Sequence, residues 1–317
     1  MVSFLRALFI LIVVLVIAGV VAANVFKDPD IPDSVLVQKY GQPPSKFMTL
    51  ASGAHVHYRD QGLATGSALV LLHGSNASLH TWEPWVKILG NEFRVITVDL
   101  PSHGLTGAVP GDDYSQAGMV AFVDQFTTQL GVPTFALGGN SMGGGVAARF
   151  ALTFPARVTK LILIDAAGMP TKHPTDPGIG FRLARIPVVQ NLMLYVTPRS
   201  LFEEGLRKAI YNGSLVTPEM VDRYWELNRR AGNRAATLKR FQEPLDTYIQ
   251  DNATKITTPT LILWGDKDTL IPPDAGEAYR DAIKGSQFIV YNDVGHLAME
   301  EVPERSAEAV RRFLRGR

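Results

Sequence analysis

The chain has 317 residues, 46% of them hydrophobic and 19% charged, which excludes a disordered, collagen-like or coiled-coil protein. Its 31 Lys and Arg residues nearly balance 30 Asp and Glu residues, and the formal charge of +1 argues against a nucleic-acid-binding protein. Cysteine is absent, which excludes disulfide frameworks, thiolate nucleophiles and cysteine-ligated zinc.

The N-terminal segment, residues 7–26, carries no charged side chain. A helix of this length spans roughly 30 Å, the hydrocarbon thickness of a bilayer, so residues 1–26 are predicted to hold one transmembrane helix bound to membrane lipid. Arg6 precedes the segment, which favours a single-pass protein with its main body on the non-cytoplasmic side. The alternative is a cleaved signal peptide and a secreted protein, because the small residues Ala22 and Ala23 resemble a cleavage site.

Residues 27–46 are predicted to form a linker, because they contain four prolines and scattered charges but no long apolar period. From 47 to 317, short apolar runs alternate with helical periods. Predicted strands cover 48–58, 68–72, 94–100, 134–137, 161–164 and 260–264, another strand begins near 287, and predicted helices cover 117–130, 142–154, 274–283 and 303–314. This alternation predicts an α/β domain with a mostly parallel, doubly wound sheet.

The region from about 169 to 250 contains helical periods and no buried-strand pattern, so it is predicted to be a helical cap inserted between two core strands. Its apolar side chains are expected to line a cavity that favours uncharged esters; they are Phe181, Leu183, Leu192, Met193 and Leu194. The cap also holds 12 Lys or Arg against 8 Asp or Glu, and most of these charges are expected on solvated helix faces.

The sequence GNSMG at 139–143 places a G-x-S-x-G pattern between a predicted strand and a predicted helix. On such a tight turn Ser141 projects its hydroxyl above the sheet, which makes it the candidate nucleophile. The sequence HGSN at 73–76 directly follows another buried strand. Its loop can offer the backbone N–H of Ser75 to a developing oxyanion, with the N–H of Met142 as the second donor. His73 is expected to brace this loop rather than to act in catalysis.

An acid and an imidazole follow the last two predicted strands, in WGDKD at 264–268 and VGH at 294–296. Because the order Ser, Asp, His is the one required on this kind of sheet, His296 is the predicted base and Asp268 the acid that orients it. Asp266 is assigned to the turn, and Asp165, at another strand end, is a less favoured acid.

With these motifs the chain resembles the α/β-hydrolases from about residue 47 to the end. GNSMGG resembles the nucleophile turn of the meta-cleavage-product hydrolases, which split carbon–carbon bonds, although Leu297 stands where those enzymes tend to have tryptophan. This resemblance implies that Arg223 or another cap arginine meets an acidic substrate, as in those enzymes. LILWGDKDTLIP and VGHLAMEEVPE resemble the acid and base segments of the esterase and lipase-like branch. The resemblance implies a serine hydrolase. Serine at position 141 disfavours the aspartate-nucleophile epoxide hydrolases and dehalogenases.

Three further features of the sequence point to functions other than ester hydrolysis. GGGVAA at 143–148, with Asp165 following, fits a dinucleotide-binding pattern, but its first glycine lies beyond the strand-to-helix turn. His55 and His57 share a strand face, but without a third ligand they are expected to be surface histidines. A catalytically silent, membrane-tethered binding protein is a further alternative, because fold does not guarantee function.

The sequence therefore predicts a serine hydrolase that cleaves a small-molecule, ester-like substrate through an acyl-enzyme. The runner-up is hydrolysis of a carbon–carbon bond. No cofactor, metal or nucleic-acid partner is expected, and the natural substrate and oligomeric state stay open.

Overall fold

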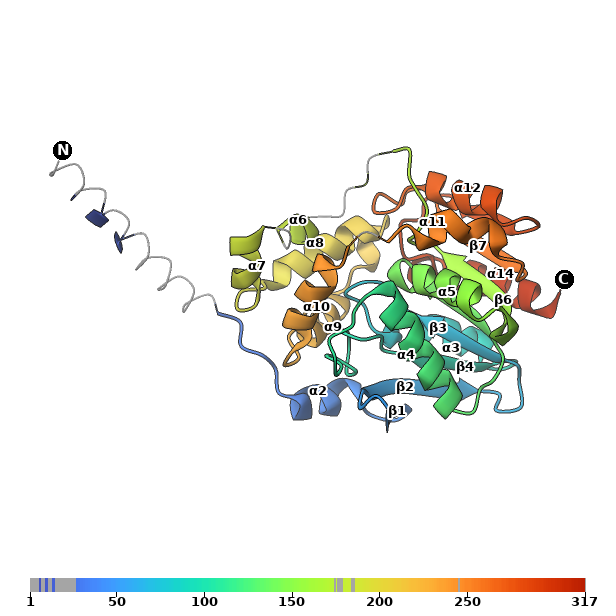
Figure 1. Cartoon of the computed structure of the whole chain (residues 1–317), viewed down its shortest axis with the longest axis horizontal. Coiled ribbons are helices and arrows are strands. Elements are labelled where there is room, and N and C mark those ends of the chain that lie inside the picture. The colour runs from blue at the N-terminus through green and yellow to red at the C-terminus, as the bar shows by residue number, and fades with distance from the viewer. Residues whose placement is uncertain are drawn as a thin grey trace.

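The computed structural model describes residues 27–173, 175, 179–183, 186–244 and 246–316, together with five positions between Arg6 and Val14 (Figure 1). Within these residues we find no helix whose length and apolar character would suit a bilayer span. The segment predicted to be transmembrane, 7–26, lies almost entirely outside the described residues. Its membrane assignment therefore stays a prediction.

The fold is built on an eight-stranded sheet with the order β1-β2-β4-β3-β5-β6-β7-β8. Its strands are β1 (Ser45–Thr49), β2 (His55–Gly62), β3 (Ala68–Leu72), β4 (Arg94–Val98), β5 (Phe135–Asn140), β6 (Val158–Ile164), β7 (Thr260–Gly265) and β8 (Gln287–Tyr291). The pairs β1–β2 and β2–β4 are antiparallel, and all the other pairs are parallel. The predicted mostly parallel sheet is confirmed.

The prediction of one continuous strand over 48–58 is wrong, because these residues belong to a hairpin of two strands. β1 and β2 pair in antiparallel fashion, with Thr49 opposite His55, and a short turn joins them. Gly53 in that turn has φ of 84°, a left-handed conformation that glycine adopts without steric cost. The apolar alternation continues on both sides of the turn, so the pattern alone does not separate the strands.

Helices cover both faces of the sheet (Figure 1). In β3, Val70 and Leu72 pack into the core beneath α4 (Gln116–Gln129), α5 (Met142–Thr153) and α12 (Pro273–Ala282). Leu69 and Leu71 pack into the core on the opposite face, against α3 (Glu83–Leu89) and α14 (Pro303–Arg315). A strand buried on both faces is apolar at every position, which is why these runs were recognisable.

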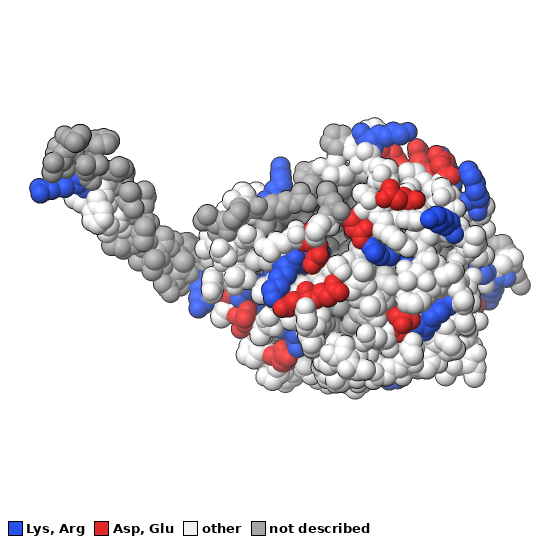
Figure 2. All heavy atoms as spheres, viewed as in Figure 1, with Lys and Arg blue, Asp and Glu red and all other residues white. Residues whose placement is uncertain are grey.

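The cap lies between β6 and β7, and every described element in it is helical. These elements are α6 (Ile179–Leu183), α7 (Pro187–Met193), α8 (Arg199–Ala209), η3 (Gly213–Leu215), α9 (Pro218–Asn228), α10 (Asn233–Gln242) and α11 (Tyr248–Asn252), with η4 (Ala253–Lys255) leading into β7. The short helix α13 (Ala298–Glu301) follows β8. Basic and acidic side chains are interspersed over the face drawn in Figure 2, in keeping with the nearly balanced charge.

The segment predicted as a linker is docked on the cap. Residues 28–40, which we call the N-terminal strap, include α2 (Asp33–Tyr40). The N–H of Ile31 donates to the carbonyl of Arg229 over 2.8 Å, and Asp30 pairs with Arg234 at 2.6 Å. Leu36 is buried against Leu105 and Leu227. The strap is therefore a packed part of the fold, although its polar composition resembles that of a spacer.

Candidate active site

The predicted nucleophile stands at a strained turn between β5 and α5. Ser141 has φ of 55° and ψ of −120°, a conformation that a residue with a side chain adopts only when its surroundings hold it there. Its N–H donates to the carbonyl of Ile164 at 3.0 Å, and its own carbonyl accepts from the N–H of Ala167 at 2.9 Å. The turn is thus tied to the end of β6.

The two glycines of the GNSMG turn are required by close backbone contacts. A Cβ at Gly139 would lie 2.2 Å from the carbonyl oxygen of Gly143, and one at Gly143 would lie 2.3 Å from that of Leu72. Any side chain at either position would push α5 away from the sheet. The glycines serve helix–sheet packing, and the GGGVAA run lies inside α5 instead of at its turn. This placement disfavours the dinucleotide-binding interpretation.

The predicted acid and base meet in the fold. Nδ1 of His296 lies 2.6 Å from Oδ2 of Asp268, and both side chains are buried. The other oxygen of Asp268 accepts from the N–H groups of Leu270 and Ile271, at 2.8 and 3.0 Å. The carboxylate is therefore held on both oxygens, and the contact at Nδ1 leaves Nε2 of His296 as the nitrogen for chemistry.

Asn140 joins the base loop to the nucleophile turn. Its Nδ2 donates to the carbonyl of His296 at 3.0 Å and to that of Ile164 at 3.2 Å. Because Asn140 directly precedes Ser141, this contact brings the loops that follow β5 and β8 to one edge of the sheet. That edge, at the carboxyl ends of parallel strands, is where α/β proteins bind ligands.

Asp165, the less favoured acid, lies behind Asp268. Its Oδ1 accepts from the N–H of Gly265 at 2.9 Å, while its buried Oδ2 has no partner among the described residues. Burial, followed by the charge of Asp268, raises the pKa of Asp165 well above its usual range. A protonated Asp165 would orient an imidazole less well than the Asp268 carboxylate, which contacts Nδ1 of His296.

Asp165, Asp268 and His296 each offer a ligand atom within 4.8 Å of the others, the only such group among the described residues. A metal bound among these three residues needs deprotonated carboxylates and Nδ1 of His296, the imidazole nitrogen beside Asp268. Here Asp268 and His296 are bonded to each other, and the raised pKa of Asp165 favours its protonated form. The three residues therefore fit an acid–base pair of Asp268 and His296 beside a protonated Asp165 better than they fit a metal centre.

The predicted oxyanion loop contacts the nucleophile turn. His73 is buried and braces the loop as expected, since Nε2 accepts from the N–H of Leu100 at 3.0 Å and Nδ1 donates to the carbonyl of Gly74 at 2.8 Å. A Cβ at Gly74 would lie 3.1 Å from that of Ser141, so Ser75 follows a backbone that passes directly over the nucleophile. Met142 begins α5, where a helix leaves its first N–H groups without intrahelical acceptors.

One expectation about the early histidines is wrong. His55 is exposed, but His57 is fully buried, with Nδ1 2.6 Å from Asp99 and Nε2 2.8 Å from the hydroxyl of Ser45. Sequence reasoning missed this pair because Asp99 lies 42 residues away and carries no local signal. Asp99 also accepts from two loop N–H groups, of Leu79 and Leu105, so the pair stabilises loops near the site.

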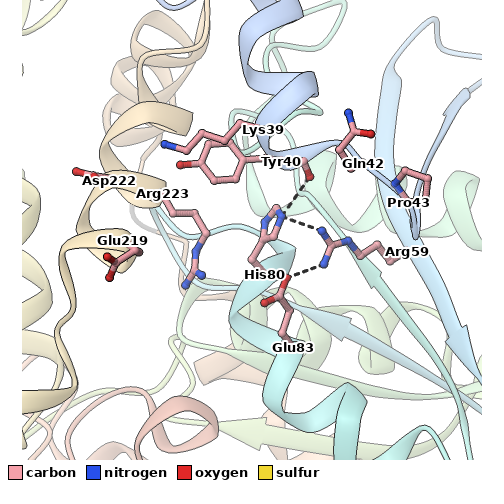
Figure 3. Close-up of a pocket in the computed structure, with 10 residues that line it drawn as sticks. All are labelled: Lys39, Tyr40, Gln42, Pro43, Arg59, His80, Glu83, Glu219, Asp222 and Arg223. Carbon is pink, nitrogen blue, oxygen red and sulfur yellow. Dashed lines mark hydrogen bonds and ion pairs between the residues drawn. The ribbon is translucent and has the colours of Figure 1, made fainter.

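Arg223, the cap arginine singled out from the sequence, is engaged by Glu300 at 3.6 Å. It borders a polar pocket of about 350 Å³ between α2, β2, α3 and α9 (Figure 3). The ion pair of Arg59 and Glu83 also lines this pocket, and its lining contains none of the predicted catalytic or oxyanion residues. Of the predicted apolar cap residues, Leu192 is exposed and the side chain of Phe181 lies outside the described set, so the cavity stays a prediction.

A model of the alpha/beta hydrolase fold family matches residues 67–303. The chain belongs to this family. A monoacylglycerol lipase of Xenopus laevis is 29% identical over 265 residues, which make up 81% of this chain and 78% of the relative. A 2-hydroxy-6-oxononadienedioate/2-hydroxy-6-oxononatrienedioate hydrolase of Klebsiella pneumoniae is 29% identical over 283 residues, 85% of this chain and 95% of the relative.

A solved structure of a membrane phospholipase A, described as a bacterial virulence factor, matches with a TM-score of 0.74 and 26% identity. The match covers 100% of this chain and 99% of that one. The family and these relatives identify the chain as a hydrolase. They include enzymes of lipid esters and an enzyme named for a dienedioate substrate, so the bond that this chain cleaves has to be argued from its own residues.

Proposed function

We propose that this hydrolase cleaves carboxylic esters through a Ser141–His296–Asp268 triad. The observation that carries the proposal is the buried contact of 2.6 Å between Asp268 and His296, with the His296 loop bonded to the residue before Ser141. An acid, an imidazole and a hydroxyl in this order at one sheet edge supply an oriented base and a half-buried nucleophile on a tight turn.

In the proposed reaction, Nε2 of His296 takes the proton of Ser141 as Oγ attacks the ester carbonyl carbon. The N–H groups of Ser75 and Met142 donate to the oxygen on which negative charge develops. His296 then gives the proton to the departing alcohol, which leaves an acyl-Ser141. Water attacks this ester with His296 again as base, and the carboxylic acid leaves as the proton returns to Ser141.

A fluorophosphonate probe and a set of p-nitrophenyl esters test this proposal together. The purified protein should hydrolyse the esters, and the probe should label Ser141, as mapped by mass spectrometry of the tryptic peptide. A Ser141→Ala protein should lose both reactions while retaining its melting temperature. Normal turnover or labelling in Ser141→Ala would contradict the assignment.

Carbon–carbon bond hydrolysis is the second candidate, favoured by the Klebsiella pneumoniae relative named above. The ester set is therefore assayed beside a vinylogous diketone acid of the ring-cleavage type. Leu297 stands next to the base in this chain, where the carbon–carbon hydrolases tend to have tryptophan. Strong turnover of the diketone acid with negligible ester activity would reverse the ranking.

Membrane attachment through residues 1–26 is proposed on the uncharged run 7–26 and on the full-length match to a membrane phospholipase A. The intact protein should fractionate with membranes, with its main body on the non-cytoplasmic face. Protease added to sealed vesicles of known orientation checks this arrangement. Digestion only from the cytoplasmic face would refute the orientation, and a mature terminus near Asn24 would identify a cleaved signal.

A further inference from the structure

Arg240, on the cap helix α10, reaches the proposed oxyanion site. Its Nη2 donates to the hydroxyl of Ser75 at 2.9 Å, and its Nη1 lies 3.5 Å from the sulfur of Met142. Ser75 and Met142 are the two residues whose backbone N–H groups face the reacting carbonyl in the proposed mechanism. The guanidinium is thus only one side chain away from the place where an ester would react.

The guanidinium of Arg240 lies over the ring of Phe241, with Cζ 4.5 Å from the ring centroid. Among the described residues it forms no ion pair, and burial, with no carboxylate to oppose it, lowers its pKa to about 9. Burial above all, and then the charge of Arg240, lower the pKa of both His73 and His103. The buried acid in this region, Asp99, is already bonded to His57.

Arg240 also has hydrogen-bonding capacity to spare. A guanidinium carries five N–H donors, and one of the two acceptors described above is a thioether sulfur, a weak acceptor. Its Nε is buried and has no partner among the described residues. A planar fork with free donors matches the paired oxygens of a carboxylate or a phosphate.

Building on the proposed ester hydrolysis, we propose that Arg240 binds an anionic group of the substrate, a carboxylate or phosphate close to the scissile ester. Other cap arginines are engaged by acids of the protein itself: Arg223 by Glu300, and Arg234 by Asp30. Arg240 differs from them in contacting the side chains of Ser75 and Met142 and in having no acidic partner among the described residues. The expected substrate is therefore an acidic ester, in place of the uncharged esters suggested by the apolar cap sequence.

Two matched substrate pairs test this inference. The first is p-nitrophenyl butyrate and mono-p-nitrophenyl glutarate, which differ by a carboxylate on the acyl side. The second is monolauroylglycerol and its phosphate monoester, which differ by a phosphate on the alcohol side. The measured quantity is the ratio of kcat/KM for the anionic to the neutral member, in the wild type, Arg240→Gln, Arg240→Lys and Lys239→Gln. Lys239 is exposed and adjacent, so its substitution removes the same charge without reaching the site.

Arg240→Gln should lower this ratio by about 10- to 100-fold in one pair, the effect of one charge-assisted hydrogen bond, and the affected pair identifies the side that carries the anion. Lys239→Gln should leave both ratios within about twofold, and Arg240→Lys should be intermediate because it keeps the charge but loses the fork.

Unchanged ratios in Arg240→Gln, or a wild type that disfavours both anionic esters by more than about tenfold, would overturn the inference, and the second result needs no variant to fold. Failure of the ester proposal is distinguishable, because then neither the wild type nor Lys239→Gln would hydrolyse any of the four esters.

Discussion

The sheet edge that carries Ser141 and the cap that contacts it are held by different forces. At the edge, the strained Ser141 turn and the Asp268 carboxylate are fixed by buried hydrogen bonds to backbone N–H and carbonyl groups. The cap is joined to the N-terminal strap by the Ile31–Arg229 backbone hydrogen bond and the buried Leu36, and also by ion pairs whose strap acids, Asp30 and Asp33, are exposed. Surface charge and salt should therefore affect the strap–cap ion pairs more than the geometry of the sheet edge around Ser141.

The largest expected effects come from the edge itself. Replacing Ser141 or His296 by alanine should lower kcat by about 10⁶-fold, because members of a triad act as a unit. The Ser141→Ala, His296→Ala double variant should be no worse than either single variant. Steady-state kinetics of the three proteins check this, and additive losses would show that the two residues do not share a step.

Substitutions of Asp268 and Asp165 test which of the two acids orients His296. Asp268→Asn should lower kcat by about 10⁴-fold, since an amide holds the His296 ring in the wrong tautomer. Asp165→Asn should cost less than about tenfold, because asparagine resembles the protonated carboxyl that burial favours there. Comparable losses in the two variants would assign both acids to the catalytic pair.

Asp165 should also make stability depend on pH. Its folded pKa is raised, so between about pH 4 and that pKa the folded state binds more protons than the unfolded state. The free energy of unfolding should therefore fall as pH rises, by up to about 1.4 kcal/mol per pH unit from this group. Urea unfolding at pH 5, 6 and 7 should show a shallower fall in Asp165→Asn, and parallel slopes would contradict the raised pKa.

The same division explains what the sequence could predict. The turn around Ser141 and the segments of Asp268 and His296 are short motifs at the ends of apolar strands, so local pattern locates them. The strap pair of Asp30 and Arg234 joins residues 204 positions apart, and neither carries a motif. Burial of His57 and the approach of Arg240 to Ser75 likewise depend on tertiary contacts, which no one-dimensional period records.

Two N-terminal truncations distinguish the contribution of the strap from that of residues 1–26. A protein lacking residues 1–26 keeps the strap and should remain folded and active. Removing residues 1–33 also deletes Asp28, Asp30 and Asp33, which bond to the cap, and should lower Tm by about 5 °C or more and raise KM more than it lowers kcat. Thermal unfolding and kinetics of the two proteins check this. Equal Tm and KM would show that the strap contributes nothing to the cap.

The smallest effect is expected from a single strap contact. Arg234 is nearly buried and Asp30 is exposed, so their interaction should be worth about 1 kcal/mol or less. A double-mutant cycle with Asp30→Asn and Arg234→Gln measures it as the non-additive part of the free energy of unfolding. Because the acid faces solvent, the coupling should shrink in 0.5 M NaCl, at a Debye length of about 4 Å. The kcat losses of Asp268→Asn and Asp165→Asn provide the control. They should change little with salt, because both acids are buried. A coupling free energy that is unchanged by salt would show that the strap ion pair is as insensitive to salt as the buried contacts of the sheet edge, and would contradict the difference between the two regions.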